Sequence, residues 1–342
     1  MHFVSPWYKF KHRSDEGTTK NHGGSIEQVV KNIAMIKGIL VTAFIFFEGM
    51  LFGQPRARHA VDSGYAEVNN TRLYYEVAGQ GQAIVFVHGS FGDRRFWDFQ
   101  MSDLSKKYKV LRYDLRGFGK SALPKEEEVY RDCDDLLALL NYLKIERAHV
   151  CGLSYGSFIV IDFALAYPEK CLSLIPIGPR VAGDDLNEFK ANSDSLRPTI
   201  AKTIDLLKTS GRKEATDFLW TGDNCLSRSV QSSKALDVLL KMGYEYSWWR
   251  HLHPSKREYA FPQAIKHLDE LKMPTLVITA DYDLPICKQV ATTLAKGIQD
   301  AKLVSIKGAG HIMNMDKPEQ FNKAISKFIR KQGKFTGTEI GL

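Results

Sequence analysis

Cysteine is scarce in this sequence, and its spacing matches no metal or disulfide motif. The 342 residues contain five cysteines, an odd number, which lie far apart and include no C-x-x-C pair: Cys133, Cys151, Cys171, Cys225 and Cys287. We therefore expect neither a zinc site nor a disulfide framework. Cys151 and Cys171 fall in apolar runs and are expected to pack as small buried hydrophobic residues.

Strong charge of one sign and long hydrophobic runs are also missing. The mean hydropathy of −0.25 is too low for a protein that crosses a membrane several times. Residues 1–60 carry +4 of the net charge of +8, which leaves +4 for the other 282 residues. That excess is too small for a nucleic-acid-binding surface. An aromatic content of 11% argues against global disorder, and the length suits one large α/β domain or two small ones.

The first sixty residues form an N-terminal extension with a candidate signal or anchor segment at 38–53. Residues 38–47 contain no charge and follow Lys37. This run is shorter than the roughly 20 residues of a membrane span and fits the roughly 7–15 residues of a signal-peptide core. We hypothesise that translation begins at Met35 and that cleavage occurs near Gly53, which predicts an exported protein. The alternatives are an uncleaved anchor or a plain extension on a cytoplasmic protein.

From residue 65 to residue 331, strand-like apolar runs alternate with helical stretches. Asn69-Asn70 is a hairpin turn signal between the first two runs. Strands are predicted at 65–68, 72–77, 83–87, 110–113, 148–151, 172–177, 275–279 and 302–306, and helices at 126–143, 157–166, 287–298 and 318–331. The pattern predicts an α/β domain with a mostly parallel central sheet and helices on both faces.

The strand signal disappears after the sixth predicted strand. The stretch from about 181 to 261 is rich in aromatic residues and reads as helices, which predicts a helical insertion within the domain rather than a second domain. Residues 332–342 form a C-terminal tail. The sequence does not indicate the oligomeric state.

Gly152-Leu-Ser-Tyr-Gly156 is a G-x-S-x-G motif in the setting that its chemistry needs. It follows the apolar run at 148–151 and precedes the helical stretch at 157–166. A nucleophile elbow requires this strand–turn–helix context, because a side chain at either glycine would collide with the neighbouring strand or helix. The motif predicts Ser154 as a nucleophile at a helix N-terminus, which favours developing negative charge.

A serine needs a base to remove its proton, and the chain order places candidates for the base and the acid after Ser154. His311 lies in the loop after the last predicted strand, and the other late histidines, His251, His253 and His267, are expected at the surface or in the insertion. Asp281 and Asp283 follow the strand at 275–279. We favour Asp283 as the acid that holds the histidine tautomer, because of its spacing before Pro285.

Two backbone N–H groups are expected to bind the oxyanion of the reaction. One belongs to Tyr155, directly after the nucleophile. The other belongs to the loop after the strand at 83–87, where Ser90 is the first candidate and Phe91 the second. His88, at the start of that loop, is expected to support it.

These motifs together resemble the α/β-hydrolase superfamily over residues 65–331. The resemblance rests on His88-Gly89, on DLRGFGKS at 114–121, on GLSYG, on Asp283 and on GAGH at 308–311. It implies a Ser154–Asp283–His311 triad, a helical lid at about 181–261, and no metal or organic cofactor. Ala280 stands where the family commonly has glycine.

The residues also narrow the class of hydrolase. Related dehalogenases and epoxide hydrolases use an aspartate nucleophile, whereas this chain has Ser154. The segment at 88–100 is similar to the arylesterase, enol-lactonase and haloperoxidase-like branch, so we predict hydrolysis of a small or medium carboxylic ester or lactone. A C–C bond hydrolase and a non-enzymatic ligand receptor on the same fold remain alternatives. About two of six aromatic residues in the insertion are expected to touch substrate: Phe218, Trp220, Tyr244, Tyr246, Trp248 and Trp249.

Overall fold

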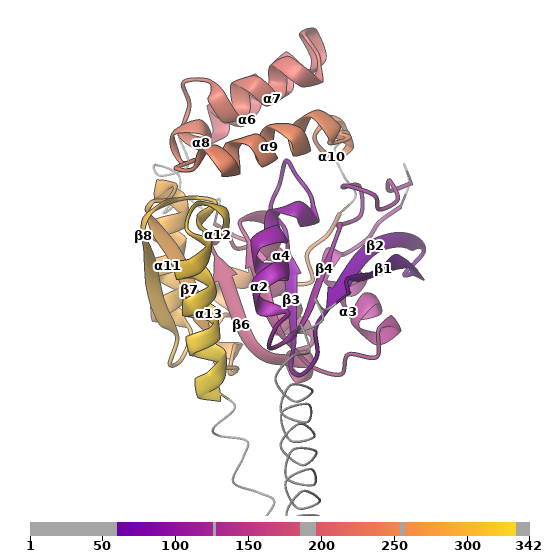
Figure 1. Cartoon of the computed structure of the whole chain (residues 1–342), viewed down its shortest axis with the longest axis vertical. Coiled ribbons are helices and arrows are strands. Elements are labelled where there is room, and N and C mark those ends of the chain that lie inside the picture. Colours follow the sequence, from indigo (N-terminus) through magenta and orange to yellow (C-terminus); the bar gives the residue numbers. More distant parts are fainter. Residues whose placement is uncertain (1–59, 126–127, 185–195, 254–256, 333–342) are drawn as a thin grey trace, which may run out of the picture. The chain divides into compact units, whose positions relative to one another are not determined.

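The computed structural model describes residues 60–125, 128–184, 196–253 and 257–332. All of them belong to the unit formed by residues 59–342. The described strands form one eight-stranded sheet in the order β1-β2-β4-β3-β5-β6-β7-β8 (Figure 1). They are β1 (Asp62–Val68), β2 (Thr71–Ala78), β3 (Ala83–Val87), β4 (Lys109–Tyr113), β5 (Ala148–Leu153), β6 (Cys171–Ile177), β7 (Leu276–Tyr282) and β8 (Lys302–Gly310).

Only the β1 end of this sheet is antiparallel. Strand β2 pairs antiparallel with both β1 and β4, and every other pair of neighbouring strands is parallel. Asn69 and Asn70, which join β1 to β2, have φ values of 45° and 57°. A two-residue hairpin turn needs positive φ at both positions, and asparagine tolerates it. The predicted hairpin and the mostly parallel sheet are confirmed.

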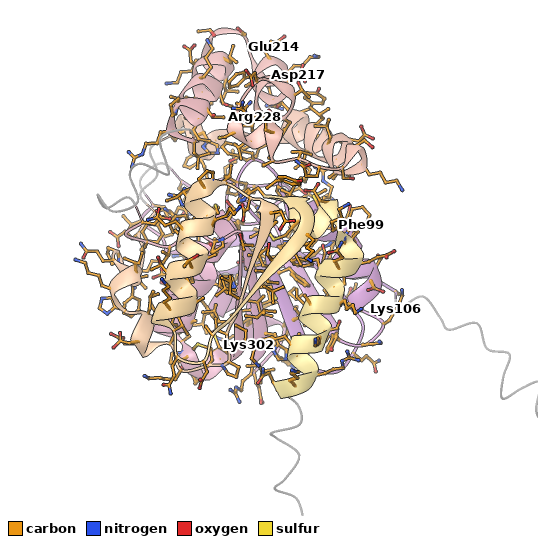
Figure 2. All side chains as sticks on the ribbon, turned by 90° about the vertical axis from the view of Figure 1, so that its left-hand side faces the viewer. Phe99, Lys106, Glu214, Asp217, Arg228 and Lys302 are labelled. Atoms are coloured by element: carbon orange, nitrogen blue, oxygen red, sulfur yellow. The ribbon has the colours of Figure 1, made fainter. Side chains whose placement is uncertain are left out.

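Helices cover both faces of the sheet. Helix α2 (Asp98–Leu104) packs on α13 (Pro318–Gln332), and α3 (Asp132–Tyr142) packs on α4 (Tyr155–Ala166). Figure 2 looks onto the β8 edge and shows α13 and α11 (Pro285–Gly297) on opposite sides of the strands. The predicted layering is therefore confirmed.

Helix α3 begins later than the sequence predicted. The apolar pattern suggested a helix from residue 126, but Tyr130 forms a β-bridge with Arg257 and its carbonyl accepts the N–H of Glu258 at 2.9 Å. This pairing keeps the backbone before α3 extended. Asp132, at the start of the helix, and two further aspartates in its first turn interact favourably with the helix dipole.

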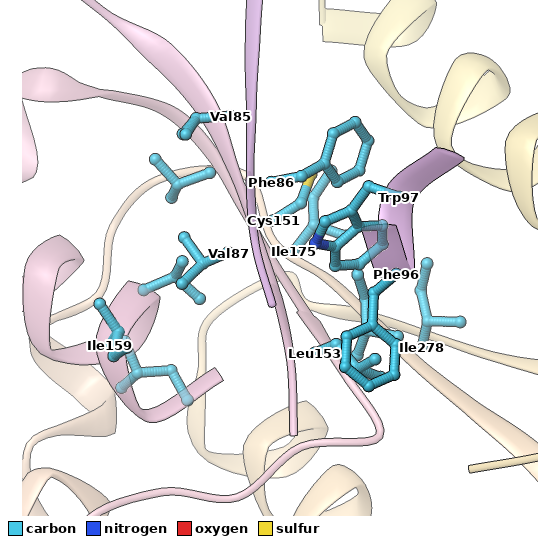
Figure 3. Close-up of a cluster of buried hydrophobic side chains, with 14 of the residues drawn as sticks. Val85, Phe86, Val87, Phe96, Trp97, Cys151, Leu153, Ile159, Ile175 and Ile278 are labelled. Carbon is cyan, nitrogen blue, oxygen red and sulfur yellow. The ribbon is translucent and has the colours of Figure 1, made fainter. Parts of the chain in front are cut away.

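The core lies on both sides of the central strand β3. Phe86 of β3 stacks on Trp97 at a centroid distance of 4.6 Å, on the same side of the strand as Phe96 (Figure 3). Val85 and Val87 point to the other side, toward Ile159 of α4. Successive side chains of a strand point to opposite faces, which explains this division, and each such side chain contributes about 1.5–3 kcal/mol when fully buried. Cys151 and Cys171 are buried as predicted.

Between β6 and β7 the chain forms a helical insertion, which lies over one end of the sheet (Figure 1). Its helices are α6 (Leu196–Thr209), α7 (Arg212–Thr221), α8 (Cys225–Arg228), α9 (Ser233–Glu245) and α10 (Trp249–Leu252). No helix in the described part of the chain is both long enough and apolar enough to span a membrane. The candidate segment at 38–53, residues 1–59 of the predicted extension and residues 333–342 of the tail lie outside the described residues.

Candidate active site

The G-x-S-x-G motif forms a sharp turn between β5 and α4. Ser154 has φ 52° and ψ −109°, a conformation that residues with a side chain rarely adopt. A Cβ on Gly152 would lie 2.2 Å from the carbonyl oxygen of Gly156, and a Cβ on Gly156 would lie 2.3 Å from that of Val87. Both neighbours are backbone atoms, so only glycine fits at either position. The turn therefore holds Ser154 at the carboxyl end of β5, where α4 begins.

His311 and Asp283 form a buried hydrogen-bonded pair after β8 and β7. The Nδ1 atom of His311 lies 2.7 Å from Oδ1 of Asp283. The carboxylate also accepts the N–H of Leu284 at 2.8 Å and the hydroxyl of Thr279 at 3.0 Å. A carboxylate that accepts a hydrogen bond from Nδ1 leaves Nε2 of the neutral His311 ring without a proton.

Asp281, the other acid considered from the sequence, has a different position. It is exposed and accepts the N–H of Gly308 and the hydroxyl of Ser305, both on β8. The hydrogen bond from Gly308 lowers the pKa of this carboxyl below its usual range. Asp281 therefore joins β7 to β8, whereas Asp283 contacts His311.

The loop after β3 runs beside the turn that carries Ser154. A Cβ on Gly89 would lie 3.6 Å from Cβ of Ser154. Phe91 has a φ of 64°, which is uncommon for a bulky residue and marks a constrained backbone. His88 is fully buried, and this burial lowers its pKa to about 4. The neutral ring accepts the N–H of Leu115 at Nε2 and contacts the carbonyl of Gly89 through Nδ1, so it supports the loop.

A cavity of about 210 Å³ connects these groups. Ser154 and His311 both line it, together with the three residues predicted to supply oxyanion N–H groups, Ser90, Phe91 and Tyr155. Most of the remaining wall is apolar and comes from the sheet, α4 and the helical insertion: Phe96, Leu153, Phe158, Leu196, Ile200, Leu226, Leu284 and Ile312. The structure therefore brings Ser154, His311 and the three predicted N–H donors to one cavity, with Asp283 hydrogen-bonded to His311 outside its wall.

The expectation that aromatic residues of the insertion contribute to this wall is wrong. None of the six is among the described residues that line the cavity. Tyr246 and Trp248 pack against each other at a centroid distance of 5.3 Å, and both are almost completely buried. His251, which the sequence placed in the insertion or at the surface, does line the cavity and stacks on Phe91 at 4.5 Å. His253 is exposed, as predicted.

The comparison with known families agrees with this geometry. The model of the family described as alpha/beta hydrolase fold matches residues 82–318, which is more than half of the chain. The chain belongs to the α/β-hydrolase family.

Similar proteins within this family include several hydrolases. A protein of Azorhizobium caulinodans that is named as a carbamate hydrolase, RutD, is 26% identical, with 77% of this chain and 97% of that protein covered. The 2-hydroxy-6-oxo-6-phenylhexa-2,4-dienoate hydrolase of Comamonas testosteroni is 23% identical, with 78% and 94% covered. The crystal structure of the enol-lactonase from Burkholderia xenovorans matches with a TM-score of 0.62 and 25% identity, covering 78% of this chain and all of the enol-lactonase.

In this α/β-hydrolase the helical insertion touches the histidine loop directly. The N–H of His311 donates to the carbonyl of Ser229, which follows α8, at 3.1 Å. Asp316 accepts the N–H of Gln231 from the insertion at 3.0 Å and that of Gly310 from the histidine loop at 2.9 Å. The insertion and the loop that carries His311 are thus joined by one backbone hydrogen bond and by the carboxylate of Asp316.

A buried polar cluster, which sequence reasoning missed, surrounds the side chain of Tyr155. The phenol donates to Asp132 at 2.5 Å and accepts from Arg257 at 2.7 Å, and Arg250 donates to the same oxygen. Burial raises the pKa of Tyr155 well above its ordinary value, so the phenol keeps its proton. Arg250 lies in α10 and Arg257 follows that helix, both within the insertion, whereas Asp132 begins α3. The cluster therefore joins Tyr155, the residue after Ser154, to the insertion and to α3.

One group of side chains has the residue types that could hold a metal ion. Ligand atoms of Asp283, Cys287 and His311 lie within 4.8 Å of one another. Burial raises the pKa of the Cys287 thiol well above its usual range, so the sulfur stays protonated and is a poor ligand. Asp283 and His311 are already hydrogen-bonded to each other. The donor chemistry of this group favours hydrogen bonding over metal binding.

Proposed function

We propose that this α/β-hydrolase cleaves a small or medium carboxylic ester or lactone through an acyl-enzyme on Ser154. The observation that carries the proposal is the shared cavity. Ser154, at its strained turn, and His311, held by Asp283 at 2.7 Å, open into the same space of about 210 Å³. A nucleophile, a base and an orienting acid in this relation are the requirements for acyl transfer.

In the proposed reaction, Nε2 of His311 takes the hydroxyl proton as Ser154 attacks the substrate carbonyl. The N–H of Tyr155 and that of Ser90, or of Phe91, stabilise the oxyanion, each contributing about 2.7–4 kcal/mol in comparable sites. His311 then protonates the leaving alcohol oxygen. Water, activated by the same imidazole, releases the acid from Ser154. Asp283 keeps the tautomer and stabilises the imidazolium throughout.

The proposal is tested with a fluorophosphonate probe, mass spectrometry and a panel of p-nitrophenyl esters. We expect an adduct on Ser154 and multiple turnovers, with both lost in Ser154→Ala. Ser102→Ala is the matched control, because Ser102 is an exposed serine of α2. An adduct without turnover on any substrate would favour a ligand receptor on this fold. The absence of an adduct from the folded protein would overturn the proposal.

A C–C bond hydrolase is the second candidate, and the likeness to the dienoate hydrolase of Comamonas testosteroni favours it. Both reactions need the same three residues. A direct competition between a simple ester and a vinylogous diketone separates them. Faster turnover of the diketone, with dependence on Ser154, would replace the ester proposal with the second candidate.

We further propose that the chain is exported, because the uncharged run at 38–47, within the segment at 38–53, has the length of a signal-peptide core. Mass spectrometry of the N-terminus of the natural protein tests this proposal. A mature N-terminus near residue 53 is expected. An intact peptide spanning residues 45–60 would contradict cleavage.

A further inference from the structure

The cavity wall contains one permanently charged side chain. Among the described residues that line it there is no aspartate or glutamate, and Arg180 is the only arginine or lysine. His251 is neutral near pH 7, because burial first, and then the charge of Arg250, lower its pKa to about 4. A mostly apolar pocket thus has one permanent cation among the described residues of its wall.

The backbone of Arg180 is tied to the nucleophile turn. Its N–H donates to the hydroxyl oxygen of Ser157 at 2.6 Å, and the same oxygen lies 2.5 Å from the carbonyl oxygen of Ser154. Arg180 follows the end of β6, next to the β5–α4 turn in the sheet order. The backbone of Arg180 therefore lies beside the turn that carries Ser154, and both residues line the same cavity.

The guanidinium of Arg180 is held along one edge. Its Nε–H and one Nη2–H donate to the carboxylate of Asp184, the latter at 2.7 Å. Asp184 is buried and also accepts the N–H of Val181. The ring of Phe158, another residue of the cavity wall, lies 5.6 Å from Cζ of Arg180. These contacts fix the plane of the guanidinium before any substrate binds.

The other edge of the guanidinium has N–H groups that Asp184 does not bind. Arginine has five N–H groups, and Asp184 engages two of them. Nη1 has no hydrogen-bond or ion-pair partner among the described residues, although only 19% of the Arg180 side chain is exposed to solvent. Two parallel N–H donors on one edge match the two oxygens of a carboxylate.

We propose that the substrate of this site is an ester or lactone that bears a carboxylate, and that the free edge of Arg180 binds that carboxylate. The inference rests on the proposed ester or lactone hydrolysis and adds its substrate class. The cavity of about 210 Å³ limits the spacer between the carboxylate and the scissile carbonyl to a few carbons. Arg180 acts as a specificity-determining residue, because the carboxylate that it binds takes no part in bond cleavage.

Two methyl esters of the same shape test the proposal. Monomethyl succinate carries a carboxylate where methyl 4-oxopentanoate carries a neutral acetyl group, and hydrolysis of both is followed in a pH-stat. We expect kcat/KM to favour the half-ester at least tenfold, with most of the difference in KM. Arg180→Met is expected to reduce this ratio to near one, and Arg180→Lys to leave an intermediate ratio.

Two further variants are expected to raise the kcat/KM ratio of the two esters or to leave it unchanged. Asp184→Asn removes the counterion of Arg180 and is expected to increase the ratio. Arg228→Met is the matched control, since Arg228 forms an exposed pair with Asp223 at 3.2 Å on the helical insertion, and it is expected to keep the wild-type ratio (Figure 2). If Arg180→Met does not fold, Arg180→Lys and Asp184→Asn still test the sign of the effect.

The same variants are tested without turnover, by protection of Ser154 from the fluorophosphonate. Succinate should protect the wild type at concentrations at least tenfold below those of 4-oxopentanamide, and this difference should vanish in Arg180→Met. Equal protection, or a wild-type ratio near one with Ser154-dependent hydrolysis, would overturn this inference alone. Failure of the probe to label Ser154 would instead overturn the proposed function.

Discussion

Asp283 and Asp281 lie two residues apart, and their exchange for asparagine gives the sharpest test of the site. In Asp283→Asn an amide oxygen can still accept from His311 and Leu284, while the amide nitrogen donates to Thr279. The change therefore removes the charge and keeps the shape. With the atoms 2.7 Å apart and an effective dielectric constant of about 20, Coulomb's law gives about 6 kcal/mol of imidazolium stabilisation.

This energy corresponds to a loss of about 10⁴–10⁵-fold in kcat/KM. Asp281→Asn changes an exposed carboxylate whose hydrogen bonds in the described structure all come from β8, so the loss of activity should stay within about threefold. Both variants are assayed on one p-nitrophenyl ester and checked for an unchanged melting temperature. A larger loss for Asp281→Asn, or a loss below tenfold for Asp283→Asn, would refute the assignment of the acid.

Three other changes test the turn, the core and the pH response. Ser154 has a φ of 52°, which strains a residue with a side chain, so Ser154→Gly should raise the free energy of unfolding by about 1–2 kcal/mol in urea titrations. The same change should lower kcat about 10⁶-fold. Gly156→Ala places Cβ 2.3 Å from the carbonyl of Val87 and should destabilise the fold by at least about 2 kcal/mol; a neutral effect would contradict the close approach. Burial lowers the pKa of His149 to about 4, so the unfolded chain binds a proton that the folded chain excludes, and stability is full above about pH 6.5 and falls toward pH 4. His149→Leu should make this slope shallower by about 1 kcal/mol per pH unit, and an unchanged slope would exclude this origin.

The sheet was predictable because its central strands are apolar on both faces. The runs at 83–87 and 148–151 are continuous in the sequence, and β3 and β5 are buried along their whole length. Ser154 and His311 were predictable from local context and chain order. Asp283 needed a choice between two acids on one loop, and only the fold shows which of them meets His311.

The pocket wall was not predictable in the same way. Arg180 follows β6 but belongs to no recognisable sequence motif. Nothing in the sequence indicates that Asp184 holds its guanidinium in place. The prediction for the aromatic residues of the insertion was wrong, because tryptophan and tyrosine can either line a pocket or pack in the core, and the sequence does not separate the two roles. Trp248 is completely buried, whereas Leu226 and His251 of the insertion reach the cavity. Which side of a short helix faces a pocket depends on tertiary contacts that periodicity does not record.

The hydrogen bond between the N–H of His311 and the carbonyl of Ser229 limits how this enzyme could be redesigned. Exchange of the insertion for that of a relative is an obvious route to a new substrate range, but it assumes that the insertion packs independently of the rest of the domain. A Cβ on Gly310 would lie 1.7 Å from the same carbonyl oxygen, so the two backbones fit together with no room for a different path. A chimera must therefore reproduce the backbone path at the end of α8, or it will misplace His311 along with the pocket.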